Sequence, residues 1–218
     1  MNILFFLGCG LMGYLLGSIP TGYWVGRWWK GIDIREHGSG SIGATNILRT
    51  VGKGPAALVL GVDALKGGLA VLMAQTLMAE CLQRQLLSLP ESGIPWVGLL
   101  AGLAAVIGHG RSIWLGFKGG KSVATSLGVL LAMSWPAALS ILGVWLAGIG
   151  LSRIVSLSSI VAAMAAPLIM FGLGQALPYG LFALAGGLYV LGSHRRNMER
   201  LWAGTEPRIG QKLPETLP

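Results

Sequence analysis

Long apolar segments alternate with short polar segments along the whole chain. Seven apolar stretches can be drawn, at residues 3–24, 55–79, 94–108, 122–133, 136–150, 154–173 and 179–191. Lipid offers the backbone no hydrogen-bond partners, so apolar stretches of this length predict membrane-embedded helices. The second and the sixth are long enough to cross a bilayer, which takes about 20 residues.

The pattern leaves the number of crossings open. The fourth and fifth stretches are short, and they fit either two tilted crossings or one re-entrant hairpin. The third could extend to Leu115 if the segment around His109 is helical. Five to seven spans are therefore open, and we predict seven, two of them short. The first stretch lacks a basic region before it and continues through Pro20, so we expect a retained helix and not a cleaved signal.

Composition supports a membrane protein. The chain has 53% hydrophobic and 11% charged residues and a mean hydropathy of +0.68. Soluble domains carry about 25% charged residues, so a soluble enzyme is excluded. The two cysteines, Cys9 and Cys81, predict neither a disulfide framework nor a metal site. We predict an all-α, polytopic transmembrane helical bundle that forms a single domain over residues 1–218.

The basic residues predict the orientation. In an alternating topology nearly all of them fall on one side of the membrane, within the segments 27–54, 109–122, 152–159 and 194–212. Only Arg84 lies on the other side, and Lys66 lies inside the second apolar stretch. Because basic loops stay on the cytoplasmic side, we predict an external N-terminus and a cytoplasmic C-terminus.

A glycine-rich polar segment follows the first apolar stretch. Residues 38–49 read Gly-Ser-Gly-Ser-Ile-Gly-Ala-Thr-Asn-Ile-Leu-Arg. Glycines allow successive backbone N–H groups to curl around an anion, and hydroxyl, amide and guanidinium groups can complete such a site. The letters also fit a dinucleotide-binding fingerprint, but no strand–helix–strand unit surrounds them, so that interpretation fails. We interpret the segment as a phosphate loop.

A second polar cluster follows the third apolar stretch. It contains His109 and then Gly116-Phe117-Lys118-Gly119-Gly120-Lys121-Ser122 at the start of a predicted helix. The spacing is one residue too short for a P-loop, and no strand precedes it. Glycines and lysines at a helix N-terminus nevertheless favour an anion. A basic turn that touches anionic lipid is the alternative.

Two further clusters lie at the ends of the last two long stretches. Ser156 follows Arg153, where serines are also good helix N-caps. His194 and Asn197 directly follow the last stretch and would share one face of a helix, which makes His194 a candidate polar ligand or general base. Within the second stretch, Asp63 and Lys66 are three residues apart. They are expected to form either a structural ion pair or a part of the site.

Together these motifs resemble one family, the bacterial integral-membrane acyl-phosphate:glycerol-3-phosphate acyltransferases of phospholipid synthesis. The resemblance covers nearly the whole chain and includes residues 17–22, 38–49, 63–67, 117–125, 156–157 and 194–206. Three positions depart from the family pattern: Ser41 replaces an asparagine, Ser112 a proline after the histidine, and Ser122 a glycine after the lysine. Each keeps small size or a hydrogen-bonding group.

The resemblance implies a set of site residues. The candidate catalytic residues are His194, Asn197 and Ser156. The candidate substrate- and phosphate-binding residues are Ser39, Gly40, Gly43, Thr45, Asn46, Arg49, Lys118, Gly119, Gly120, Lys121 and Glu206. No metal and no cofactor is implied.

The resemblance also implies a reaction. An acyl group would pass from acyl phosphate to the 1-hydroxyl of glycerol 3-phosphate without an acyl-enzyme, giving lysophosphatidic acid and phosphate at the cytoplasmic face of a bacterial plasma (inner) membrane. Its partners would be acyl phosphate, glycerol 3-phosphate and membrane lipid, and no nucleic acid. Whether it also associates with the soluble enzyme that supplies acyl phosphate is left open. The alternative is a transporter for a phosphorylated or anionic solute, because glycine-broken helices can also aim at an anion.

Overall fold

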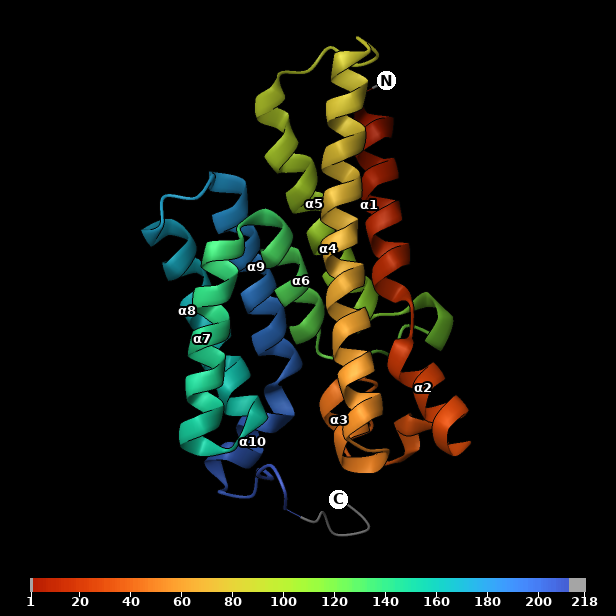
Figure 1. Cartoon of the computed structure of the whole chain (residues 1–218), viewed down its shortest axis with the longest axis vertical. Helices are drawn as coiled ribbons and strands as arrows, with labels where there is room; N and C mark the ends of the chain where they lie inside the picture. Colours follow the sequence, from red (N-terminus) through yellow and green to blue (C-terminus); the bar gives the residue numbers. More distant parts are fainter. Residues whose placement is uncertain (1, 212–218) are drawn as a thin grey trace.

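The computed structural model describes residues 2–211, and within them every regular element is a helix (Figure 1). The long elements are α1 (Asn2–Ser18), α4 (Lys53–Gln83), α5 (Ile94–Gly110), α7 (Trp135–Ser152), α8 (Val155–Gly172) and α9 (Leu177–Ser193). The shorter ones are α2 (Thr21–Lys30), α3 (Ala44–Thr50), α6 (Val123–Met133), α10 (Arg195–Trp202) and the 3₁₀ turns η1 (Ile34–Glu36), η2 (Glu91–Gly93) and η3 (Ile113–Leu115). The prediction of an all-α protein is confirmed.

Five helical segments are long and apolar enough to cross a membrane. They cover Asn2–Lys30, Lys53–Gln83, Glu91–Leu115, Trp135–Ser152 and Val155–Gly172. The other two apolar helices, α6 and α9, are shorter. These seven segments coincide with the seven apolar stretches of the sequence, while the number of crossings and their direction stay predictions.

One prediction of a continuous helix is wrong. The first apolar stretch does not form one helix, because α1 ends at Ser18 and α2 starts at Thr21. Pro20 lies between them and has no backbone N–H to donate to the preceding turn. For the third stretch, whose extension to Leu115 the sequence left open, α5 ends at Gly110 and η3 forms a separate turn.

Glycines allow neighbouring helices to approach closely. A Cβ on Gly13 or Gly17 of α1 would collide with the backbone of Ala101 or Ala105 on α5. On α6, a Cβ on Gly128 would collide with the backbone of α4. Small residues at such contacts are how helices pack in lipid, where the hydrophobic effect between helices is weak.

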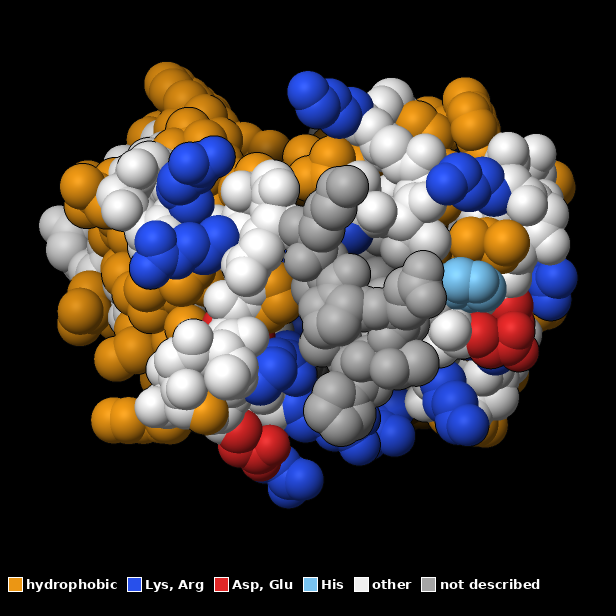
Figure 2. Space-filling view, turned by 90° about the horizontal axis from the view of Figure 1, so that it is seen from below, with side chains coloured by type: hydrophobic (Ala, Val, Ile, Leu, Met, Phe, Trp, Pro, Cys, Tyr) orange, Lys and Arg blue, Asp and Glu red, His pale blue; other side chains and the backbone are white. Residues whose placement is uncertain are grey.

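The outer surface of the bundle is apolar. Large hydrophobic side chains are exposed along its helices, among them Leu69 on α4, Leu168 on α8 and Leu188 on α9. Lysine and arginine side chains instead gather at the lower end of the molecule, which carries α3 and α10 (Figure 2). An apolar surface with basic groups at one end is the pattern expected of a helical membrane protein. Lys212, which the sequence analysis places in the last basic segment, lies outside the described residues.

Candidate active site

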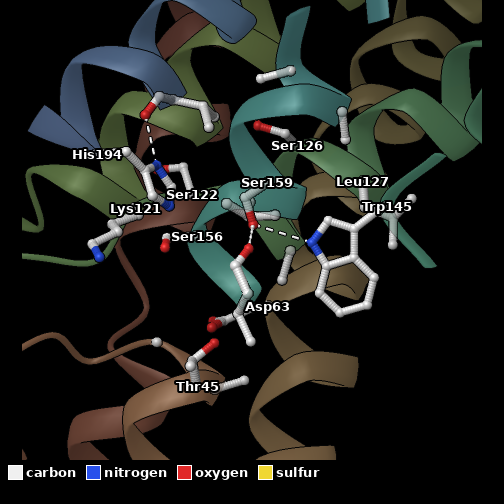
Figure 3. Close-up of a pocket in the computed structure, with 18 of the residues that line it drawn as sticks. Thr45, Asp63, Lys121, Ser122, Ser126, Leu127, Trp145, Ser156, Ser159 and His194 are labelled. Carbon is white, nitrogen blue, oxygen red and sulfur yellow. Dashed lines mark hydrogen bonds between the residues drawn. The ribbon is translucent and has the colours of Figure 1, made fainter. Parts of the chain in front are cut away.

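One cavity of about 220 Å³ lies between α3, α4 and α6 and the helices α7 to α10 (Figure 3). Its lower end is polar and its upper end apolar. The polar lining includes Ser39, Ser41, Thr45, Asn46, Arg49, Lys121, Ser156, His194, Asn197 and Glu206. The apolar lining includes Leu130, Ile141, Leu142, Trp145, Ala162, Ala166, Phe182 and Ala183. A molecule with a charged head and an apolar tail matches this division.

The glycine-rich loop of residues 38–43 is held together by Asn46, the third residue of α3. The Asn46 amide nitrogen donates to the backbone oxygens of Ile34, His37 and Ser41, at 3.2, 3.0 and 2.8 Å. Its side-chain oxygen accepts from the backbone N–H of Ser39 at 3.0 Å. The buried amide is therefore fully engaged within the loop, so Asn46 shapes the loop rather than offering free groups to a ligand.

Lys121, Asn197 and Glu206 form a hydrogen-bonded chain across the polar end. The ammonium of Lys121 donates to Asn197 Oδ1 at 2.5 Å. Asn197 Nδ2 donates to Glu206 Oε1 at 2.6 Å. This chain links the turn before α6 to α10 and to the segment after it, so residues distant in sequence meet at one place.

Glu206 accepts hydrogen bonds from three side chains, two on α10 and one on α8. Besides Asn197, Ser156 Oγ donates to its Oε1 and Arg200 Nε to its Oε2, both at 2.7 Å. Burial alone would raise the pKa of Glu206, but these hydrogen bonds outweigh it and lower the pKa. The carboxylate therefore stays charged and is a weak base.

The start of α8 differs from the N-cap interpretation of its serines. Ile154 occupies the N-cap position, without a side-chain cap. Ser156 donates to Glu206, and Ser159 donates to the backbone oxygen of Val155 at 2.8 Å. Ser156 faces the cavity because the first turn of α8 borders it.

His194 lies at a break between two helices. It follows α9 and is the N-cap residue of α10, which contains Asn197, and both side chains line the cavity. The Nδ1 atom lies 2.8 Å from the backbone oxygen of Val190 and must carry the proton, because a carbonyl only accepts. Burial lowers the pKa of His194 to about 4, and the charge of Lys121 adds to this. The ring is therefore neutral, with Nε2 left as an acceptor.

The polar end carries more positive than negative charge. Arg49 and Lys121 line it together with Glu206, and Arg200 pairs with that carboxylate. Burial lowers the pKa of Lys121 to about 8, against the attraction of Glu206, so the ammonium is still mostly charged near neutral pH. Among residues 2–211, no three histidine, cysteine or acidic side chains come together as a metal site.

Most of the predicted site residues line the cavity. The exceptions are Gly40, Lys118, Gly119 and Gly120, which do not line it. Gly40 has a φ of +68°, a conformation that favours glycine, so it shapes the loop. Gly119 and Gly120 lie against His109, and Lys118 is exposed.

The three departures from the family pattern are accommodated locally. Ser41 Oγ accepts from the backbone N–H of Gly43 at 3.3 Å. Ser112 Oγ donates to the backbone oxygen of Ser18 at 2.5 Å. Ser122 has a φ of +61°, in the region where glycine is favoured, and its hydroxyl donates to the backbone oxygen of Val106 at 2.7 Å.

Several cavity residues carry no assigned role in the predicted site. Trp145 on α7 was not among the predicted site residues, yet it lines the cavity and donates to Ser159 Oγ at 3.1 Å (Figure 3). Asp63 and His109 also line it. The sequence left Asp63 open as a structural ion pair or a part of the site, and it placed His109 in the second polar cluster without assigning it a role. The charge of Asp63 within an apolar stretch was the one signal available for it, while no pattern identified Trp145.

Comparisons with known proteins show the family of this chain. Residues 7–204 match the family described as glycerol-3-phosphate acyltransferase. The chain is 67% identical over 206 residues to a glycerol-3-phosphate acyltransferase of Synechococcus sp. (strain JA-3-3Ab), covering 94% of each chain. It is 57% identical over 211 residues to one of Nostoc sp., covering 94% of this chain and 93% of the relative.

A solved structure is also similar. It is a crystal structure of PlsY, an integral membrane glycerol 3-phosphate acyltransferase, in its glycerol 3-phosphate form. The TM-score is 0.84 at 38% identity, over 94% of this chain and 96% of the other. The chain belongs to the glycerol-3-phosphate acyltransferase family and is an integral membrane protein.

Proposed function

We propose that this protein transfers an acyl group from acyl phosphate to the 1-hydroxyl of glycerol 3-phosphate, giving lysophosphatidic acid and phosphate. The single observation that carries the proposal is the division of one cavity into a cationic polar end and an apolar end. Membership of an acyltransferase family favours this enzyme over the alternative of an anion transporter.

The polar end provides for two phosphate groups. Arg49 comes from α3 and Lys121 from the turn before α6, so two cations from different elements border the same space. Hydroxyls of Ser39 and Thr45 can donate to phosphate oxygens, and charge-assisted hydrogen bonds from the two cations would dominate affinity. A PlsY structure in the glycerol 3-phosphate form supports binding of that substrate in this fold.

The apolar end provides for the acyl chain. Ser156 and Ala166 both line the cavity on α8, which spans about 15 Å of helix rise between them. Phe182 borders the deep part from α9. A PlsY structure in a lysophosphatidic acid form shows that a relative accepts a product with an acyl tail.

The chemistry needs little beyond positioning. The hydroxyl oxygen attacks the acyl carbon, the bond from that carbon to the phosphate oxygen breaks, and the leaving phosphate takes the hydroxyl proton. Neutral His194 can accept a hydrogen bond from the hydroxyl through Nε2 and so orient it. Asn197 holds Lys121 in place, as its amide bridges Lys121 and Glu206.

An acyl-enzyme on Ser156 fits the geometry poorly. A serine nucleophile needs a base that takes its proton. The hydroxyl of Ser156 donates to Glu206, which also accepts from Asn197 and Arg200 and has a lowered pKa. These contacts support a role for Ser156 in holding Glu206 and favour direct transfer.

Donor choice tests this proposal. The purified protein in detergent is supplied with glycerol 3-phosphate and either acyl phosphate or acyl-CoA of the same chain length, and lysophosphatidic acid is measured by mass spectrometry. We expect product only from acyl phosphate, and none from a variant that lacks both cations, Arg49→Ala/Lys121→Ala. Efficient use of acyl-CoA would refute the donor assignment.

We also propose that the polar end faces the cytoplasm of a bacterial plasma membrane, with the N-terminus outside. The basic residues around this end support the orientation. Single cysteines at Lys53 and Lys118 should resist impermeant thiol reagents in intact cells and react after lysis, with Arg84→Cys as the control that reacts from outside. Labelling of Lys53→Cys in intact cells would overturn the orientation.

A further inference from the structure

The glycine turn before Lys121 rests on a buried histidine. The backbone N–H of Gly120 donates to the backbone oxygen of His109 at 3.1 Å. A Cβ on Gly119 would collide with that oxygen, and a Cβ on Gly120 would collide with the imidazole Nε2. The turn therefore lies directly against His109, and its path depends on where the imidazole stands.

A buried ion pair lies on the other side of this imidazole. Lys66 Nζ is 2.7 Å from Asp63 Oδ1, and His109 Nδ1 is 3.6 Å from the same oxygen. The side chains of Asp63, Lys66 and His109 are only 1%, 4% and 3% exposed. Within the described part of the chain, no group hydrogen-bonds to His109 Nδ1, so Asp63 is the polar group that faces it.

The same ion pair is fixed to the segment between the first two helices. Lys66 Nζ also donates to the backbone oxygen of Ile19 at 2.7 Å, in the break between α1 and α2. The cluster thus connects this break with α4 and α5, and it lies against the turn that leads into α6. All of this lies next to the substrate cavity, since Asp63 and His109 line it together with Lys121.

Packing alone does not explain charges at this place. Replacing a buried ion pair by apolar residues of similar volume is often neutral or stabilising, so such a pair is weak support for a purely structural role. A charged oxygen that faces the imidazole can instead fix the ring's orientation, in the way a carboxylate orients a histidine elsewhere.

We propose that Asp63, Lys66 and His109 form a positioning unit for Lys121. The ion pair sets the His109 ring, the ring sets the glycine turn, and the turn directs the Lys121 ammonium into the cavity. The inference rests on the proposed function, in which Lys121 binds a substrate phosphate. None of the three needs to touch substrate for this role.

A double-mutant cycle between His109 and Gly120 tests the contact. Lys121→Ala first identifies the substrate whose KM reports on Lys121. We expect His109→Ala and Gly120→Ala each to raise that same KM about tenfold, with a smaller effect on kcat. A tenfold change corresponds to the weakening of one charge-assisted hydrogen bond. In His109→Ala/Gly120→Ala, the added methyl enters the space left by the ring, so the KM should rise less than the product of the two single effects.

Controls separate this role from loss of folding. Gly61→Ala on α4, where a Cβ meets nothing within 4 Å, should keep wild-type KM values and thermal midpoint. His109→Gln, which puts an amide in place of the ring, should recover part of the KM lost in His109→Ala. If the two effects on KM multiply in the double variant, or if His109→Ala keeps wild-type KM values, the proposed role of this contact in positioning Lys121 is refuted.

The ion pair is tested with both charges removed. Asp63→Asn alone leaves Lys66 buried and unpaired, which by itself destabilises the fold strongly. Asp63→Asn/Lys66→Met removes both charges and should keep the thermal midpoint within a few degrees of wild type, yet raise the KM that Lys121→Ala raises. A folded double variant with wild-type KM would overturn the proposal. Absence of glycerol 3-phosphate acylation by the wild type would instead refute the proposed function.

Discussion

Two substitutions of His194 separate its two nitrogens. Glutamine places an amide near the position of Nε2, which faces the cavity, whereas asparagine places one near Nδ1, which donates to Val190. If His194 orients the glycerol hydroxyl through Nε2, His194→Gln should keep part of the rate and His194→Asn should lose nearly all of it. If His194 were an obligatory general base, both variants would lose activity equally.

The pKa of His194 gives the size of the pH effect. A pKa lowered from 6.5 to about 4 favours the neutral ring by roughly 3 kcal/mol. At pH 6, about one ring in a hundred would be protonated, compared with about three quarters for an ordinary histidine. The wild-type kcat should therefore stay flat down to about pH 5.

The lowered pKa also affects stability. Because the folded pKa lies below the unfolded one, the unfolded chain binds more protons between pH 4 and 6.5. The free energy of unfolding should therefore fall as the pH is lowered through this window, by up to roughly 3 kcal/mol from this residue. His194→Gln removes the titrating group, so its thermal midpoint should depend less on pH in the same range.

The assay is a pH profile of kcat for the wild type and both variants, at saturating substrates because the phosphate groups themselves titrate near pH 6. The thermal midpoint is followed in parallel in detergent. A wild-type kcat that falls by half near pH 6.5, together with an inactive His194→Gln, would refute the positioning role. Equal activity of the glutamine and asparagine variants would refute the proposal that Nε2 orients the glycerol hydroxyl.

Four further predictions concern other cavity residues. The kcat/KM should decline above about pH 8, where Lys121 loses its proton, while kcat changes less; a flat profile to pH 9.5 would contradict the lowered pKa. Arg49→Lys should raise the KM for a phosphate substrate, since a point charge replaces a fork of donors; unchanged kinetics would remove Arg49 from the site. Asn197→Ala should lower activity at least as much as His194→Gln, because Lys121 loses its partner; initial rates at matched protein levels check this. Ala166→Phe should shift use from long to short acyl phosphates by filling the deep end of the cavity, and an unchanged chain-length profile would place the acyl chain elsewhere.

The helices could be predicted well because lipid leaves the backbone few choices. Seven apolar stretches became seven apolar helical segments, with ends shifted by a few residues. The break at Pro20 was missed because the apolar run continues across it. The local rule that proline restricts the residue before it would have favoured a break there.

The candidate site could be predicted only as far as its parts are contiguous in sequence. The loop before α3 was found from its glycines and hydroxyls, but the role of Asn46 depends on how the loop folds around one amide. The contact of Asp63 with His109 depends on how α4 packs against α5. Glu206 meets Ser156 because the chain returns after α10, and no spacing rule contains that information.

Phosphate release in the absence of glycerol 3-phosphate tests the central claim of direct transfer most directly. The purified protein, at a concentration high enough to count single turnovers, is mixed with acyl phosphate alone, and inorganic phosphate is followed from the first seconds. Direct transfer predicts no burst of phosphate, and then release in equal amount with lysophosphatidic acid once glycerol 3-phosphate is added. A burst equal to the amount of enzyme before that addition would show an acyl-enzyme and contradict the account.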